Sequence, residues 1–393
     1  MMKRQALTLL WLCFCLTSIC QTYRYKADFS LSKKNFCDTI PIEVEDDQIF
    51  VNAVIGDRSY RLNIDTGSSH GMIFSDSPIS PLLNLGNILS RDANGQTDSV
   101  KVVSLPPFRI GNLVVSNYVA SAMSRPAVEH NYDAIIGFDL FNKGLFGKID
   151  ARRKILILTD NKKLFRKEEG HELRYKLKWF VPYVGINPFP GCLDQALFDT
   201  GSRQLYTMNK QFFDQQEASG TTAKTLVEGR TKGRNAIGGF GSEEDEEVVF
   251  LHLDCIKWND FAFSDIRTTT TQGSSKLGAQ LLNYGSLIIN PKRKSLVFQP
   301  FEQGDSVVVG NKPTNITFVP LNGRASVGLI YPLCDAYLKG IRSGDVIVQI
   351  DDTPILSFND FRQFRFVKDK EHVLTLIDRD GEKKVIAIEL LQE

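Results

Sequence analysis

The sequence predicts a mainly β protein made of two similar lobes followed by a small C-terminal domain. The lobes are predicted by the motif Asp-Thr-Gly-Ser, which occurs at residues 65–68 and again at 199–202, each time after a short apolar run. Two copies are not expected by accident, because average composition gives roughly 0.1 Asp-Thr-Gly triplets in a chain of this length. The β class is predicted by short runs rich in Val, Ile and Leu that alternate with turn residues.

The length and the charge of the chain limit the functions that it can have. A chain of 393 residues is long enough for two to four domains with sizeable cores. It carries 47 Lys and Arg against 46 Asp and Glu. Because this balance creates no strong field of one sign, nucleic acid is not expected as a partner.

Residues 1–20 have the pattern of a secretory signal peptide. Lys3 and Arg4 precede an apolar run over residues 6–20, which is shorter than the roughly 20 residues of a spanning helix. The chain is therefore expected to be exported to the periplasm, the cell envelope or the medium. A lipid anchor on Cys20 is the alternative, and Ile19 immediately before it makes that alternative less favoured.

The N-terminal lobe is placed at residues 38–168. Strands are expected at residues 49–54, 59–64, 100–103, 113–115 and 155–158, with a short helix near 138–142. Asn94-Gly95 lies between polar residues before a Val-rich run, and it predicts the tip of a hairpin. The charged stretch 160–172 is expected to be an exposed connection to the next lobe.

The C-terminal lobe is placed at residues 169–303, and it repeats features of the first. Ile135-Ile136-Gly137 is matched by Lys276-Leu277-Gly278, and residues 149–157 are echoed by 289–297 as strand, basic turn and strand. Gly238 to Gly241 and the acidic run that follows predict a flexible, solvated loop. The alternative is a mobile cover at the edge of a cleft.

No metal or cofactor is expected. Four cysteines follow the signal peptide, at positions 37, 192, 255 and 334, and they lack metal-ligand spacing. Buried thiols are favoured over a disulfide or a metal role. The histidines are isolated, and no His-Glu-x-x-His motif is present.

A small third domain is placed at residues 304–393, after a linker at 302–305. Residues 340–352 have an apolar residue between two glycines followed by Asp and an alternating strand, which predicts a tight turn leading into a strand. A helix is expected within 357–366, and strands are expected at 373–377 and 384–390.

The two Asp-Thr-Gly-Ser motifs suggest a chemistry if the lobes bring Asp65 and Asp199 together. Two carboxylates that close cannot both ionise cheaply, so the pair would hold one proton and activate a water between them. The glycines would allow close approach of backbone, and the Thr hydroxyls could bond across the lobe interface. The Ser hydroxyls could bond the outer carboxylate oxygens. These supporting residues are Thr66, Gly67, Ser68, Thr200, Gly201 and Ser202.

The doubled motif with its paired apolar-Gly segments resembles the pepsin-like and retropepsin-like aspartic endopeptidases over residues 38–303. The resemblance implies a bilobal acid-protease β fold, a polypeptide substrate in the cleft between the lobes, and Asp65 and Asp199 as the catalytic pair. The chain departs from pepsins in two respects. Its lobes are short, nearer a fused pair of retropepsin-like units, and no Tyr stands near Asn94-Gly95 where a pepsin flap carries one. An inactive two-lobed peptide-binding or scaffold protein of the cell envelope is therefore the alternative.

The tail resembles a PDZ domain of the type attached to bacterial envelope proteases. This resemblance implies that Val327, Gly328, Leu329 and Ile330 form a carboxylate-binding loop and groove strand, which would take a peptide C-terminus as an added strand. The alternative is a domain that only packs on the protease. Because both lobes lie in one chain, a monomer is expected rather than a dimer built from single lobes.

Overall fold

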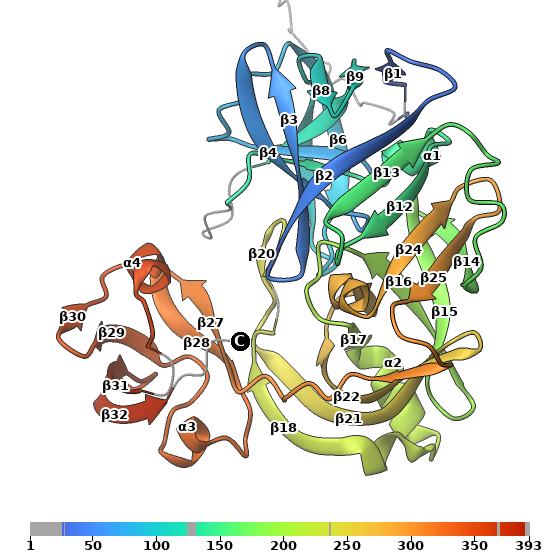
Figure 1. Cartoon of the computed structure of the whole chain (residues 1–393). Coiled ribbons are helices and arrows are strands. Elements are labelled where there is room, and N and C mark those ends of the chain that lie inside the picture. The colour runs from blue at the N-terminus through green and yellow to red at the C-terminus, as the bar shows by residue number, and fades with distance from the viewer. Residues whose placement is uncertain (1–25, 27, 124–130, 236, 368–369, 390–393) are drawn as a thin grey trace, which may run out of the picture.

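The computed structural model describes residues 26, 28–123, 131–235, 237–367 and 370–389. The predicted signal peptide and Cys20 lie outside these residues. The protein is mainly β, as predicted, and it consists of an N-terminal lobe, a C-terminal lobe and a tail domain beside the C-terminal lobe (Figure 1). In the part of the chain described, no helix is both long and apolar enough to cross a bilayer.

The N-terminal lobe contains short strands and one single-turn helix. Its elements are β1 (Ser30–Leu31), β2 (Cys37–Glu45), β3 (Gln48–Ile55), β4 (Arg58–Ile64), β5 (Gly71–Phe74), β6 (Leu83–Arg91), β7 (Thr97–Ser104), β8 (Phe108–Ile110), β9 (Leu113–Ser116), β10 (Val119–Met123), β11 (Ala134–Ile136), α1 (Asp139–Asn142), β12 (Phe146–Asp150) and β13 (Ile155–Thr159). All five strand runs expected from the sequence fall within these strands. The side chains of β2 alternate between exposed and buried, as period-2 patterning requires.

The C-terminal lobe repeats this plan with longer strands. Its elements are β14 (His171–Lys178), β15 (Val181–Phe189), β16 (Cys192–Asp199), β17 (Tyr206–Asn209), α2 (Lys210–Ala218), η1 (Thr222–Leu226), β18 (Val227–Gly233), β19 (Ile237–Gly238), β20 (Gly241–Ser242), β21 (Glu246–Trp258), β22 (Phe261–Thr271), β23 (Lys276–Gly278), η2 (Ala279–Asn283), β24 (Gly285–Asn290), β25 (Ser295–Pro300) and β26 (Ser306–Val308).

A six-stranded antiparallel sheet joins the two lobes. Its order is β2-β13-β12-β24-β25-β14, so three strands come from each lobe. The lobes meet where β12 pairs with β24, with Lys148 opposite Ile288. The predicted strand-turn-strand repeats are the hairpins β12–β13 and β24–β25 at the centre of this sheet. One hydrophobic core runs through both lobes as a result.

The tail domain has a separate core and its own sheet, in the order β27-β28-β29-β31-β32 with β30 paired to β29. Its elements are β27 (Ile316–Leu321), β28 (Arg324–Ile330), α3 (Asp335–Leu338), β29 (Val346–Ile350), β30 (Thr353–Pro354), α4 (Phe358–Gln363), β31 (Glu371–Ile377) and β32 (Lys383–Glu389). Helix α4 begins with a capping box in which Ser357 and Asp360 each bond the other's backbone N–H.

The boundaries of the domains differ from those expected. Phe29 is buried in the first lobe and β1 pairs with β9, so that lobe begins before residue 38. Residues beyond 303 are not a free linker, because β26 adds to the C-terminal lobe by pairing in parallel with β22. Backbone hydrogen bonds between this segment and β22 continue as far as Gly310, whose N–H donates to the carbonyl of Asp265. The tail domain therefore starts after Gly310.

All four described cysteines are free thiols. Cys192 and Cys334 are buried, Cys255 is half-buried, and Cys37 is exposed. Burial was expected for the set as a whole, and Cys37 differs because it opens β2 on the solvent side of the sheet. No group of three or more His, Cys, Asp or Glu side chains suited to a metal ion occurs within the described ranges.

Candidate active site

The two Asp-Thr-Gly-Ser motifs occupy equivalent places at the ends of buried strands. Strand β4 pairs in parallel with β11, and the backbone N–H of Asp65 donates to the carbonyl of Ile136 at 3.0 Å. Strand β16 pairs in parallel with β23, which places Asp199 beside Gly278. Each Asp is thus held at the end of its strand by the apolar-Gly segment of its own lobe.

Thr66 and Thr200 tie the two motifs together across the lobe interface. The backbone N–H of each donates to the hydroxyl of the other, both at 3.0 Å. Each hydroxyl also donates to a carbonyl of the opposite lobe, that of Phe198 at 2.9 Å and that of Ile64 at 2.7 Å. Both Thr side chains are fully buried, so these four bonds are shielded from water.

The carboxyl groups of Asp65 and Asp199 are hydrogen-bonded to each other. Oδ1 of Asp65 accepts the backbone N–H groups of Gly67 at 2.8 Å and Ser68 at 3.2 Å, and Oδ1 of Asp199 accepts that of Gly201 at 3.0 Å. Burial, followed by the charge of Asp199, raises the pKa of Asp65 well above its usual range. The pair therefore keeps a proton on Asp65 at pH values where an exposed Asp has lost it.

The motif glycines pack on the carboxylate of the opposite lobe. A Cβ atom on Gly67 would lie 2.5 Å from the carboxyl carbon of Asp199, and one on Gly201 would lie 2.7 Å from that of Asp65. No real Cβ contact is that short, so a larger residue would push the carboxyl groups out of place. These positions need glycine because the two motifs approach so closely.

The motif serines do not have the role expected of them. Ser68 Oγ donates to the carbonyl of His70 at 2.7 Å rather than to a carboxylate. Ser202 contributes its backbone, since its carbonyl accepts the N–H of Ala279 at 2.8 Å and the equivalent carbonyl of Ser68 accepts that of Phe138 at 2.8 Å. Both serines therefore join the Asp-Thr-Gly turn to the apolar-Gly segment behind it.

His70 is a buried residue near the site that sequence reasoning missed. Its Nδ1 bonds the hydroxyl of Ser69 at 2.8 Å, and its Nε2 bonds that of Ser121 at 2.7 Å. Burial lowers the pKa of His70 to about 4, so the ring is neutral above that pH. A Cβ on Gly137 would lie 2.6 Å from the His70 backbone, so His70 fixes the turn that follows Asp65. An isolated histidine gives no such signal in the sequence.

A buried Tyr–Asp hydrogen bond lies in each lobe, and the sequence did not indicate either. The Tyr118 hydroxyl donates to Asp139 at 2.7 Å and accepts the N–H of Gly137 at 3.1 Å. The Tyr206 hydroxyl donates to Asp194 at 2.5 Å, and burial raises the pKa of Asp194. The partners are 21 and 12 residues apart, so only the fold brings them together.

The predicted hairpin at Asn94-Gly95 is formed by β6 and β7, and we call residues 92–96 the flap tip. The Asp92 carboxylate holds this turn by accepting the N–H groups of Asn94 at 3.0 Å and Gln96 at 2.9 Å. The tip is not exposed to solvent on all sides, because it contacts the glycine-rich segment of the C-terminal lobe.

That segment, residues 237–243, is named the latch here. It forms the two-residue strands β19 and β20, and it contacts the flap tip through three hydrogen bonds. These are Phe240 N–H to Asp92 at 3.1 Å, Gln96 Nε2 to the Ser242 carbonyl at 3.2 Å and Asn94 Nδ2 to the Gly241 carbonyl at 3.4 Å. The expectation of a solvated loop is therefore replaced by its alternative, a cover that meets the flap.

The latch is held at both ends. The buried carboxylate of Glu243 accepts the Thr271 hydroxyl and the N–H of Gln272. The residues that flank the latch contact the tail domain: the N–H of Arg234 donates to the Gly328 carbonyl at 2.8 Å, and Arg379 forms an ion pair with Asp245. The latch thus contacts the flap tip and the C-terminal lobe, and its flanks contact the tail domain.

The residues expected to form a peptide groove in the tail domain are placed elsewhere. Val327, Gly328, Leu329 and Ile330 lie within β28 rather than in a loop, and all four are buried. A Cβ on Gly328 would lie 2.7 Å from Val319 and 3.0 Å from the Arg234 carbonyl, so this strand packs against the C-terminal lobe. The apolar run is a core strand, and its glycine allows the two domains to approach closely.

Comparisons with known proteins add a similarity of fold. No family model matches the sequence, and no curated protein matches it. The structure is similar to an aspartic proteinase from Irpex lacteus, with a TM-score of 0.42 and 12% identity over 67% of this chain and 97% of that one. It is also similar to Basic 7S globulin from soybean, with a TM-score of 0.39 and 12% identity over 67% and 94%. Similarity at this level gives no information on activity or substrate.

Proposed function

We propose that this protein is an aspartic-type endopeptidase that uses Asp65 and Asp199 as one catalytic unit. The observation that carries the proposal is the hydrogen-bonded carboxyl pair, held by reciprocal threonine bonds between the lobes. Carboxyl groups with strongly raised pKa values destabilise the folded state, and they cluster at functional sites. No other pair of carboxyl groups among the described residues combines these features.

The pair can hydrolyse a peptide bond without a covalent intermediate. The ionised carboxylate of the pair takes a proton from a water between the carboxyl groups, and the water oxygen attacks the carbonyl carbon of the peptide. The protonated carboxyl of the pair donates a hydrogen bond to the carbonyl oxygen as negative charge develops there, and the pair then holds two protons. The tetrahedral intermediate collapses when the leaving nitrogen receives one of these protons, which leaves the pair with a single shared proton.

Substrate access requires the flap tip and the latch to separate. The three hydrogen bonds between them are polar contacts of mostly half-buried residues, and each contributes only about 0.5–1.5 kcal/mol net. Opening on the microsecond to millisecond timescale is typical of such covers. The flap tip of this chain is polar and is hydrogen-bonded to the latch. A pepsin flap instead carries a tyrosine.

The tail domain is proposed to recruit polypeptide substrates, as its resemblance to PDZ domains implies. Its buried strand β28 is not available for an added peptide. In the described part of the chain β27 pairs only with β28, so its outer edge is where a peptide would add as a strand. Export and a monomeric state complete the proposal, and both rest on the sequence.

Incubation of the purified protein with casein from pH 3 to 8 tests the activity. Wild type is expected to cleave casein, whereas Asp65→Asn and Asp199→Asn should each lower the rate on the order of 10²- to 10⁴-fold. Cleavage that persists in both variants would show that another site or a contaminant is responsible. No cleavage by wild type at any pH would favour the inactive peptide-binding alternative, and gel filtration alongside reports the oligomeric state.

A further inference from the structure

The tip of the β14–β15 hairpin carries two exposed aromatic residues. Trp179 is 79% exposed and Phe180 is 53% exposed. Both have positive φ, 53° and 66°, which is the conformation of a two-residue turn that normally contains Asn and Gly. A bulky side chain in this region costs roughly 1–2 kcal/mol per residue. Folding alone therefore does not account for Trp and Phe at this tip.

The aromatic tip is fixed in place rather than loose. Lys178 pairs with Val181 at the last step of the hairpin, and Asn142 Nδ2 donates to the carbonyl of Phe180 at 2.8 Å. The rings consequently project from a rigid base. A rigid, projecting pair of aromatic rings is suited to insertion into a fluid lipid layer. Such insertion does not require an apolar groove on the protein.

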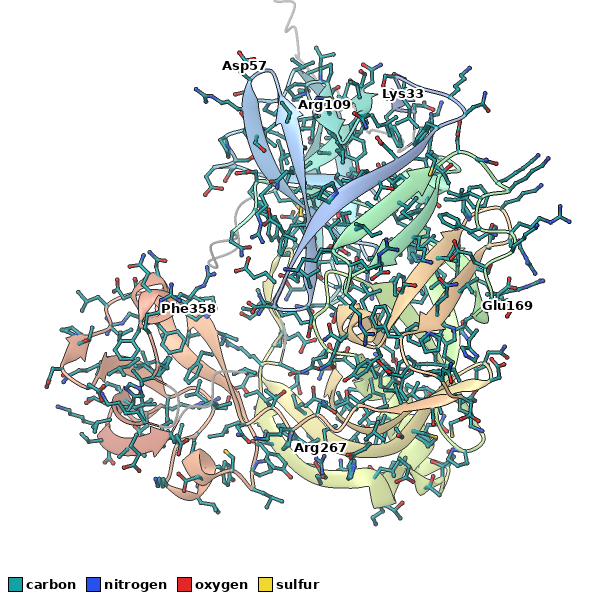
Figure 2. The ribbon with its side chains drawn as sticks, in the orientation of Figure 1. Lys33, Asp57, Arg109, Glu169, Arg267 and Phe358 are labelled. Carbon is teal, nitrogen blue, oxygen red and sulfur yellow. The ribbon has the colours of Figure 1, made fainter. Side chains whose placement is uncertain are left out.

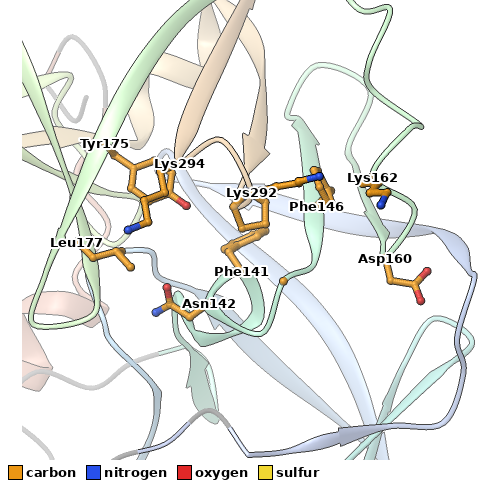
Figure 3. Close-up of a pocket in the computed structure, with 11 residues that line it drawn as sticks. Phe141, Asn142, Phe146, Asp160, Lys162, Tyr175, Leu177, Lys292 and Lys294 are labelled. Carbon is orange, nitrogen blue, oxygen red and sulfur yellow. The ribbon is translucent and has the colours of Figure 1, made fainter.

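Figure 3 shows a cavity of the C-terminal and N-terminal lobes, with a volume of about 400 Å³, whose lining includes residues that neighbour or contact this tip. Asn142, which anchors the tip, and Leu177, two residues before it, both line the cavity. The floor is formed by the buried aromatic side chains of Phe141, Phe146 and Tyr175. The tip and the cavity are therefore parts of one surface.

Three lysines line the cavity, Lys162, Lys292 and Lys294. Within the described residues none of them forms an ion pair with the protein's own carboxylates. The one acidic side chain of the lining, Asp160, already accepts two backbone N–H groups near the start of the first lobe, at 2.7 and 2.9 Å. The cavity thus presents excess positive charge over an apolar floor.

The surroundings extend this charge. The connection at residues 160–168 adds the exposed cations Lys163, Arg166 and Lys167, whereas its Glu168 is neutralised by an ion pair with Lys148. Figure 2 shows neighbouring Glu169 at the edge of the molecule farthest from Phe358 of the tail domain. A surface bound here would leave the tail domain free.

We propose that this surface binds the anionic phospholipids of a bilayer. Trp179 and Phe180 enter the headgroup region, and Lys162, Lys292 and Lys294, spread across the cavity, meet the phosphates of neighbouring lipids. Aromatic rings and lysines are the residues that favour a membrane interface, and each nearby lysine strengthens attraction to an anionic surface. A protein partner would need about 800 Å² of complementary surface with an apolar centre, and two projecting rings ringed by cations do not supply that.

Vesicle co-sedimentation of the full chain tests the proposal. Wild type is expected to bind phosphatidylglycerol vesicles more tightly than phosphatidylcholine vesicles, with the difference lost in 0.5 M salt. The N-terminal stretch, with Lys3 and Arg4, is the same in every variant, so the difference between variants isolates the charged surface. Equal binding to the two lipids would overturn the proposal.

Two variants separate the aromatic tip from the lysines. Trp179→Asn with Phe180→Gly gives the turn its preferred residues, so the hairpin stays folded while the rings are lost, and binding to anionic vesicles should fall about tenfold. A triple variant should weaken binding to anionic vesicles by roughly fivefold per lysine, with the substitutions Lys162→Gln, Lys292→Gln and Lys294→Gln. Three exposed lysines far from the cavity, Lys101, Lys224 and Lys257, provide a control triple that should weaken it much less.

Two further results would overturn the proposal. Wild-type binding by the tip variant would show that the rings do not enter the membrane. A dimer seen by sedimentation velocity in wild type but not in the tip variant would show that a second copy covers the tip instead.

Discussion

Thr66 and Thr200 each donate a backbone N–H to the hydroxyl of the other at 3.0 Å, although they are 134 residues apart. The pair joins the two lobes at the candidate site, because each threonine precedes a glycine that contacts the opposite carboxylate. The geometry of the carboxyl groups therefore depends on residues that take no part in proton transfer.

Thr66→Val is expected to lower the free energy of unfolding by about 1–3 kcal/mol, since it leaves the buried N–H of Thr200 and the carbonyl of Phe198 without a partner. Casein cleavage should fall as well, because the dyad loses its support. Thr66→Ser keeps the hydroxyl and is the matched control. Urea denaturation and kcat of both variants check this, and equal values for Val and Ser would contradict it.

Gly67→Ala is expected to abolish cleavage, because its methyl group would meet the Asp199 carboxyl carbon at 2.5 Å. Gly185→Ala in β15 is the control, since its methyl group meets only the ends of the Leu193 and Gln195 side chains, at 3.1 and 3.2 Å. Rates at saturating substrate distinguish the two. A Gly67→Ala enzyme with wild-type kcat would refute the close approach of the motifs.

The raised pKa of Asp65 predicts how stability depends on pH. An unfolded Asp ionises near about 3.9, and folded Asp65 keeps its proton to higher pH. In the window above about pH 4 the folded state binds more protons than the unfolded state, so the contribution of Asp65 to stability falls as pH rises.

Asp65→Asn removes this penalty and is expected to raise Tm at pH 7 by about 2–4 °C. The gain should shrink below about pH 4, where wild-type Asp65 is protonated in both states. Thermal scans from pH 3 to 8 measure it, with exposed Asp57→Asn as the control. A Tm difference that does not change with pH would count against a proton held on Asp65.

Gly238→Val is expected to release the latch from the flap tip, because a Cβ at this position would lie 2.3 Å from the Asp92 carboxylate. Gly239→Ala is the neighbouring control, since its methyl group meets the flexible end of Met123 at 3.1 Å and lies at ordinary contact distance, 3.7 Å, from Asp92 Cβ. Hydrogen exchange of amides 92–96 and 237–243 should be faster in Gly238→Val alone. If the exchange rates of these amides do not change, the contact between flap tip and latch does not hold the candidate site closed.

Truncation after Gly310 is expected to give a stable two-lobed protein, because it keeps β26 paired with β22. Truncation after Gln303 removes that strand and should lower Tm further. The longer product should retain cleavage of short peptides while cleaving protein substrates more slowly. Equal cleavage of both substrate types would remove the recruiting role of the tail domain.

The sequence was sufficient to predict the β class, the two lobes and the hairpins of the interlobe sheet, because each depends on local patterning and on a repeat within the chain. The pairing of Asp65 with Asp199 was expected from the repeated Asp-Thr-Gly-Ser motif and the matched segments that follow each copy. The latch contact could not be predicted, since Asp92 and Phe240 are 148 residues apart and no pattern links them. Residues 327–330 were assigned to a peptide groove because a buried core strand and a groove strand have the same apolar sequence pattern.

The meeting of β12 and β24 at the centre of the interlobe sheet has an evolutionary consequence. Two copies of a half-length ancestor could pair through this same strand and present one acidic side chain each. Duplication and fusion of its gene would then yield the present chain without any stage that lacked a complete dyad. Among the described residues, the two halves differ in that the latch belongs to the C-terminal half.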